Sequence, residues 1–204
     1  MGDAMSKVLV GQWNLASQML GGFKSNLHNA IQSTLAEEAV DLVGVIKKGI
    51  RDQAPGGETF APLSELTLAG RVFEGKGNRD KILMVDGDLL GSVTHKTGYE
   101  EAWVGVLKSK MSSDGKSMVN IAAVHEYGFE PIVIPYTDKV RKYLMAMMAA
   151  YGIEPTASEG GKKDVIIISI KPRPFLEPSF KKWSRNAADR WKRGIGRRMV
   201  GFGS

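Results

Sequence analysis

The sequence predicts an α+β fold in which a long N-terminal helix and a C-terminal helix pack on a small antiparallel sheet, with one further helix inserted. Three observations carry this prediction. Apolar residues recur at helical spacing over residues 23–52. Residues 164–170 are a run of mostly β-branched aliphatics, which disfavours helix and favours a strand. Residues 93–107 contain two short apolar segments around a turn at Gly98, the pattern of an antiparallel hairpin.

The long helix is expected from about residue 23 to residue 52. Its apolar stripe consists of Phe23, Leu27, Ile31, Leu35, Leu42, Ile46 and Ile50. Gly44 and Gly49 weaken the last turns, and the Ala-Pro-Gly-Gly segment at 54–57 ends the helix. Upstream, residues 7–13 fit either a short strand or the start of another helix.

The next part of the chain is predicted to be irregular before it enters the sheet. Residues 58–80 are rich in glycine, proline and charge, and residues 75–80 are the best candidate for a mobile loop. Two apolar stretches then follow, at 82–85 and 89–93, around a turn signal at Asp86-Gly87. We expect the stretch from 82 to 93 to open the sheet.

Two more helices follow the hairpin. A short helix is expected over residues 119–127, with Gly128 in the position just after its last turn. A longer one is expected over residues 138–151, capped by Thr137 or Asp138. The apolar face of the longer helix carries Val140, Tyr143, Leu144, Met147, Met148 and Tyr151.

The C-terminal part combines the clearest strand with a basic helix. Residues 156–163 are interpreted as a loop or as disordered. The strand at 164–170 is almost continuously apolar, which predicts burial on both faces, or one face in the fold and the other against a partner subunit. Pro172 and Pro174 end it, and a last helix is expected over residues 178–193. Its predicted buried stripe is Phe180, Trp183, Ala187 and Trp191.

Composition excludes several classes of protein. The chain is 43% apolar and 25% charged, as is ordinary for a soluble globular protein. No apolar run approaches the ~20 residues that span a bilayer, and the first residues lack the features of a secretory signal. The absence of cysteine excludes disulfides, iron–sulfur clusters, thiolate zinc sites and a cysteine nucleophile. We therefore expect no membrane partner.

The net charge of +6 is concentrated near the C-terminus. Residues 171–198 hold ten Lys or Arg against Glu177 and Asp189, a local net charge of +8, so the remainder of the chain carries −2. Such a segment fits contact with nucleic acid or with an acidic partner, and equally a solvated helix face.

The chain shows no pattern for catalysis or metal binding. His125 and the following glutamate begin like a zinc-protease motif, but Phe129 stands where the second histidine ligand belongs. Asp86 opens a segment that resembles a calcium loop, yet Leu90 and Thr97 stand where oxygen ligands are needed. We expect no enzyme activity, no metal and no cofactor.

Four short segments stand in a fixed order along the chain. The first holds Phe60, Pro62, Leu63, Ser64 and Thr67. The second holds Leu83, Val85, Asp86, Gly87, Leu89 or Leu90, Ser92 and Val93. The third holds His125, Glu126 and Gly128. The last holds Pro172, Arg173, Pro174, Phe175 and Leu176.

In this order and spacing the segments resemble the virion-morphogenesis or tail-completion proteins of tailed bacteriophages, which sit in the neck between head and tail. The resemblance runs from about residue 23 to residue 191. Two features depart from it. The second segment lacks the threonine that the family has before Gly87, and helix 138–151 with its following loop is longer than in compact members.

The resemblance implies a structural protein, with one tail-completion-like domain over residues 1–204, a helix and loop inserted at 136–163, and a flexible basic tail at 194–204. Family members form a ring on the tail axis, and a sixfold ring is implied here, through which DNA passes. The implied partners are further copies of the chain, the tail terminator or tail tube, the head–tail connector, and genomic DNA in transient nonspecific contact. The implied location is the virion neck, after assembly in the host cytoplasm.

Two groups of residues are candidates for contact with these partners. Arg173, held between two prolines, suits an inter-subunit salt bridge, and the inserted helix offers Tyr143, Met147 and Met148, for which core packing is the alternative interpretation. The basic residues expected to face the lumen or a partner are Lys181, Lys182, Arg185, Arg190, Lys192, Arg193, Arg197 and Arg198.

An alternative function is a sequence-nonspecific nucleic-acid-binding module that uses the same basic residues. Trp183 and Trp191 would then serve as stacking platforms for bases. Both lie on the predicted apolar stripe, which argues against this role.

Overall fold

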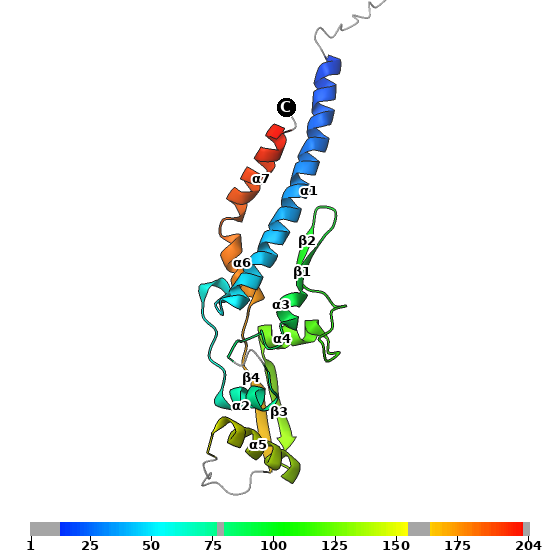
Figure 1. Cartoon of the computed structure of the whole chain (residues 1–204). Helices are drawn as coiled ribbons and strands as arrows, with labels where there is room; N and C mark the ends of the chain where they lie inside the picture. Colours follow the sequence, from blue (N-terminus) through cyan, green and yellow to red (C-terminus); the bar gives the residue numbers. More distant parts are fainter. Residues whose placement is uncertain (1–12, 77–79, 155–163, 202–204) are drawn as a thin grey trace, which may run out of the picture.

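A computed structural model describes residues 13–76, 80–154 and 164–201 (Figure 1). Within these residues the chain forms seven α-helices, a short 3-10 helix and two two-stranded antiparallel sheets. The predicted α+β class is confirmed. The prediction of a single sheet is wrong, because the strand at 164–170 pairs with a strand that the sequence analysis did not identify.

Helix α1, Trp13–Arg51, begins ten residues earlier than predicted. Its 39 residues make it about 58 Å long at 1.5 Å per residue. Leu42, Ile46 and Ile50 are buried in its C-terminal half, whereas Phe23 is 54% exposed. The 3-10 helix η1, Pro55–Gly57, ends α1 as expected.

The hairpin predicted around Gly98 is present. Strand β1, Val93–Thr97, pairs antiparallel with β2, Ala102–Val106, and both pack on α1. Helices α3, Asp88–Ser92, and α4, Met118–Tyr127, complete this part of the molecule. The core here consists of Leu42, Ile46, Ile50, Ile82, Leu83, Leu89, Val93, Val106, Met118, Ala122 and Phe175.

The expectation that residues 82–93 open the sheet is wrong except at Val93, where β1 begins, because residues 82–85 form no strand and residues 88–92 form helix α3. The Gln53 side chain takes the place of a neighbouring strand: its Oε1 accepts from the Ile82 N–H at 2.6 Å, and its Nε2 donates to the Ile82 carbonyl at 3.0 Å. Leu83 then adopts a left-handed conformation with φ of 61°. The segment is thus buried and hydrogen-bonded without forming a strand.

A second group of elements lies at the end of the molecule opposite the N-terminal end of α1 (Figure 1). It consists of helix α2, Glu65–Phe73, helix α5, Asp138–Tyr151, and the antiparallel strands β3, Phe129–Pro135, and β4, Val165–Ile170. Helices α2 and α5 pack together, and Ala69 and Met147 are buried. Helix α5 has the predicted bounds and its Thr137 cap, which accepts a hydrogen bond from the Val140 N–H.

Helix α2 lies where a loop was expected. Ser64 caps it and accepts a hydrogen bond from the Thr67 N–H at 3.3 Å, so two residues of the first motif segment act as a helix start. Three predicted segments lie wholly or partly outside the described residues. They are residues 77–79 of the predicted mobile loop at 75–80, the whole expected loop at 156–163, and residues 7–12 of the segment at 7–13.

The C-terminal helix is broken into two. Helix α6, Leu176–Ser184, is followed by α7, Ala187–Gly201, which runs along α1 (Figure 1). Residues 194–201 therefore belong to a helix and not to a flexible tail. An added Cβ at Gly194 would lie 2.7 Å from Thr34 Cγ2 on α1, so the two helices approach closely there. Phe180 was expected to be buried but is 51% exposed.

Candidate functional site

The third and fourth motif segments form one joint between α4 and α6. Glu126, at the end of α4, is buried, and its carboxylate accepts hydrogen bonds from three backbone N–H groups at the start of α6: Phe175 at 2.8 Å, Leu176 at 3.0 Å and Glu177 at 2.9 Å. These donors have no partner inside the helix, and a carboxylate suits the positive end of the helix dipole. Glu126 therefore sets where α6 begins.

Two backbone contacts close the joint. The Arg173 N–H donates to the His125 carbonyl at 2.6 Å. Gly128 ends α4, as predicted, and its φ is 80°. An added Cβ there would lie 2.9 Å from the Ile170 carbonyl oxygen and 3.0 Å from Pro172. Both the left-handed conformation and the close approach require glycine.

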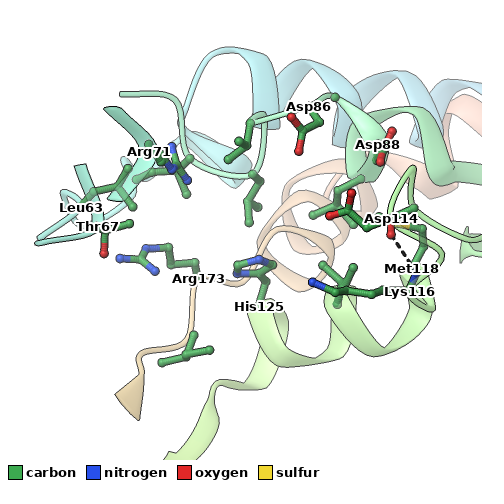
Figure 2. A pocket seen from close by; sticks show the side chains of 18 of the residues that line it. Leu63, Thr67, Arg71, Asp86, Asp88, Asp114, Lys116, Met118, His125 and Arg173 are labelled. Atoms are coloured by element: carbon green, nitrogen blue, oxygen red, sulfur yellow. Dashed lines mark hydrogen bonds between the residues drawn. The ribbon is translucent and has the colours of Figure 1, made fainter. Parts of the chain in front are cut away.

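All four motif segments contribute to one pocket of about 760 Å³. It lies between α2, α4, the segment before α3 and the connection from β4 to α6. Leu63, Asp86, His125 and Arg173 represent the four segments in its wall (Figure 2). Residues far apart in the sequence thus meet at a single concave site.

One side of this pocket is basic. Figure 2 shows Arg71, His125 and Arg173 on the side away from Asp88 and Asp114. Burial, and then the charges of Arg173 and Arg71, hold the pKa of His125 below its ordinary value. Burial and the charge of Arg173 likewise lower the pKa of Arg71. These shifts are consistent with His125 and Arg71 lying in a partly dehydrated environment near the charge of Arg173.

Two polar atoms in the basic side are buried and have no hydrogen-bond partner among the described residues. They are His125 Nδ1 and Arg173 Nε. Arg71 is oriented by a hydrogen bond from its Nη1 to the Lys81 carbonyl at 2.8 Å. Buried polar atoms are nearly always paired, so orphaned ones at a pocket wall mark a place where a ligand group can bind.

Two carboxylates on the acidic side of the pocket are held by contacts within the chain. Asp86 forms a salt bridge with Lys76 at 3.2 Å. Asp88 accepts from the Ser113 N–H at 2.7 Å and from its hydroxyl at 2.9 Å, and these two bonds lower the pKa of Asp88. The turn predicted at Asp86-Gly87 is present, with Gly87 in a left-handed conformation. Within the described residues no three His, Cys, Asp or Glu side chains are placed to hold a metal ion.

The β3–β4 ribbon leaves an apolar face uncovered. Val133 pairs with Ile167 and Pro135 with Val165, and because side chains alternate between faces, these four share one face. The exposed fractions are 58% for Val133, 66% for Ile167 and 44% for Val165. The first predicted alternative, burial of this strand on both faces within the fold, is therefore wrong, and the second, one face against a partner subunit, stays a prediction.

The predicted contact residues of α5 fall in different environments. Met147 is buried, and its Sδ would lie 3.3 Å from a Cβ added at Gly70 of α2, so it belongs to the core and not to a partner contact. Met148 is half-buried. Tyr143 is 44% exposed and meets the ring of Phe73 edge-on at 5.5 Å between centroids. Arg173 lies in the pocket wall instead of on an outer surface.

The predicted basic surface is split between internal contacts and exposed positions. Arg190 pairs with Glu38 at 2.9 Å, and Arg198 pairs with Glu37 at 2.8 Å, so both arginines hold α7 to α1. Arg197 lies 3.7 Å from Glu37 with an exposed side chain. Exposed basic residues are also found at Lys181, which pairs with Glu177, and at Lys182, Arg185, Lys192 and Arg193.

Trp183 is engaged inside the chain. Its Nε1 donates to Asp41 at 3.0 Å, and the Arg190 guanidinium lies 4.7 Å from the centre of its ring. Trp191 is half-buried.

Protein-family models, curated proteins and solved structures were compared with the chain, and none of them matches it. In the described part of the chain, no helix has the length and apolar character needed to cross a membrane.

Proposed function

We propose that this chain is a structural protein of the phage neck, which forms a ring that completes the tail and joins it to the head connector. Genomic DNA would pass through the ring. The four motif segments that resemble the tail-completion family support this proposal. Apolar and basic residues exposed on the surface support it as well.

The uncovered apolar face of the β3–β4 ribbon is the observation that carries the proposal. A two-stranded sheet is marginally stable alone, and each of its strands has an edge without a strand neighbour among the described residues. Exposed apolar surface next to open strand edges is typical of a site that another chain covers. In an assembly protein, a neighbouring subunit supplies that cover.

Apolar side chains are exposed at both ends of the molecule, which fits contacts between different faces of neighbouring copies. The ribbon lies at one end of an elongated molecule, and α1 extends to the other (Figure 1). Near its start α1 exposes Trp13, Leu20 and Phe23, by 56%, 69% and 54%. Contacts between different patches on successive copies close into a ring when the rotation permits it.

The exposed basic residues support weak contact with a DNA backbone. Lys182, Arg185, Lys192 and Arg193 carry charge on α6, α7 and their connection. Because backbone contact alone does not read sequence, it would allow DNA to move past.

An independent nucleic-acid-binding module is the alternative. The engagement of Trp183 by Asp41 and Arg190 disfavours it, since that ring is not free to stack on bases. A salt-dependent duplex-binding assay separates the two functions. Tight binding by the monomer with a steep salt dependence would support the module and contradict the neck protein.

A nonsense mutation in the gene, examined by electron microscopy of lysates, tests the proposal. We expect DNA-filled heads and separate tails that do not join, and complementation by the intact gene should restore whole particles. Normal joined particles in the absence of this chain would refute the proposed function.

A further inference from the structure

The large pocket borders the free edge of strand β4. Four consecutive residues, Ile168, Ser169, Ile170 and Lys171, line it. Three of them belong to β4, whose successive side chains point to opposite faces, so a cavity that touches all three lies at the strand's edge. Strand β4 pairs with β3 on its other edge, and no further strand joins the sheet within the described residues. The pocket therefore offers backbone donors and acceptors to an extended chain.

The same pocket places positive charge beside that edge. Arg173 lies in the connection from β4 to α6, and Arg71 of α2 lies on the same side of the pocket (Figure 2). The Arg173 Nε and His125 Nδ1 atoms are buried without hydrogen-bond partners among the described residues. Arginine pairs with carboxylates in a planar two-point geometry. An anionic group bound here would satisfy these atoms.

Two of the aspartates across the pocket have partners of their own. Asp86 is paired with Lys76, and Asp88 is held by Ser113. The rest of the wall includes apolar residues such as Leu63, Leu83 and Ile121. An apolar wall, an open strand edge and a basic corner together fit a peptide better than an inorganic anion.

We propose that this pocket binds an extended acidic peptide segment of a partner protein, which adds a strand to the free edge of β4 and places one carboxylate between Arg173 and Arg71. Strand addition of this kind takes affinity from main-chain hydrogen bonds and specificity from side-chain pockets. The site does not depend on the neck assignment, because it follows from the pocket alone.

Nuclear magnetic resonance of the isotope-labelled full chain tests the site. The probes are capped hexapeptides of alternating valine and threonine that carry one glutamate at each position in turn, with a matched glutamine set as control. We expect saturable shifts of the Ile168 and Ile170 amides and of the His125 ring. The best glutamate peptide should bind at least about tenfold tighter than its glutamine counterpart, since a hydrogen-bonded charge is lost.

Variants assign the carboxylate to the basic corner. Arg173→Gln should remove the preference for glutamate, whereas Lys108→Gln, a charge change at an exposed position away from the pocket, should keep it. If Arg173→Gln does not fold, Arg71→Gln provides the same test. Three results would each overturn the proposal. They are the absence of saturable shifts, equal binding of the glutamate and glutamine peptides, and binding of acetate or phosphate at this site as tightly as the best glutamate peptide.

Discussion

The Glu126 carboxylate accepts a hydrogen bond from the Phe175 N–H at 2.8 Å, across 49 residues of sequence. The bond links the end of α4 to the start of α6 and lies beside the buried Phe175 ring. The third and fourth motif segments, which are far apart in the sequence, therefore form one structural joint. Glu126 therefore has a structural role in this joint, to which Arg173 contributes its backbone N–H.

Replacing Glu126 should destabilise the protein strongly. Glu126→Ala leaves three N–H donors at the start of α6 without an acceptor, so we expect the free energy of unfolding to fall by about 2–4 kcal/mol. Chemical denaturation followed by circular dichroism measures this free energy of unfolding. Glu154→Ala, at an exposed position, should change it by less than about 0.5 kcal/mol. Equal effects of both substitutions would contradict the proposed joint.

Two glycines of α7 provide a matched pair for its packing on α1. Gly194→Ala brings a Cβ within 2.7 Å of Thr34 Cγ2 and should cost about 1–3 kcal/mol of unfolding free energy. Gly196→Ala meets nothing within 4 Å and should stabilise the helix by about 0.5–1 kcal/mol. Thermal melting of both variants checks the opposite signs, and a stable Gly194→Ala protein would mean that α7 does not pack as described.

Stability should decline in acid partly because of His125. Burial and the neighbouring arginines place its folded-state pKa below the ordinary value of 6.5, so the unfolded chain binds the proton more readily. The stability that neutral His125 contributes is fully present above pH 6.5, and it is lost as the pH falls from there through the folded-state pKa. Unfolding free energies measured across this range should fall less steeply for His125→Gln. Identical slopes would show that His125 is not in a dehydrated basic site.

The apolar ribbon should be needed for assembly and not for folding. Ile167→Lys adds a charge to a side chain that is 66% exposed, so the melting temperature of the isolated chain should change little. Under the proposed function, phage carrying Ile167→Lys should lose viability, because a lysine would then be buried against the neighbouring subunit. Val200→Lys, at a residue 78% exposed on α7, should leave plaque numbers unchanged. Full viability of Ile167→Lys would remove the ribbon from the subunit interface.

The sequence predicted those elements whose signals are local. Helix α5 and its Thr137 cap, the end of α4 at Gly128 and the hairpin around Gly98 all have strong short-range patterns, and all are present. Helix α2 also had a local signal in the Ser64 cap, but the glycine- and charge-rich surroundings obscured it.

The elements that were mispredicted depend on distant contacts. The two hydrogen bonds between the Gln53 side chain and the Ile82 backbone, 29 residues away, take the place of strand pairing there, and no periodicity in the sequence reveals such a contact. Arg190 was expected to face the lumen or a partner, yet Glu38 binds it from 152 residues away. The pocket was missed for the same reason, since its wall joins four segments that only the fold brings together.

Electron microscopy of virions that carry this chain with a gold-labelled tag tests the central claim most directly. A neck ring predicts label at the junction between head and tail. Label on the baseplate or on the capsid faces would contradict it.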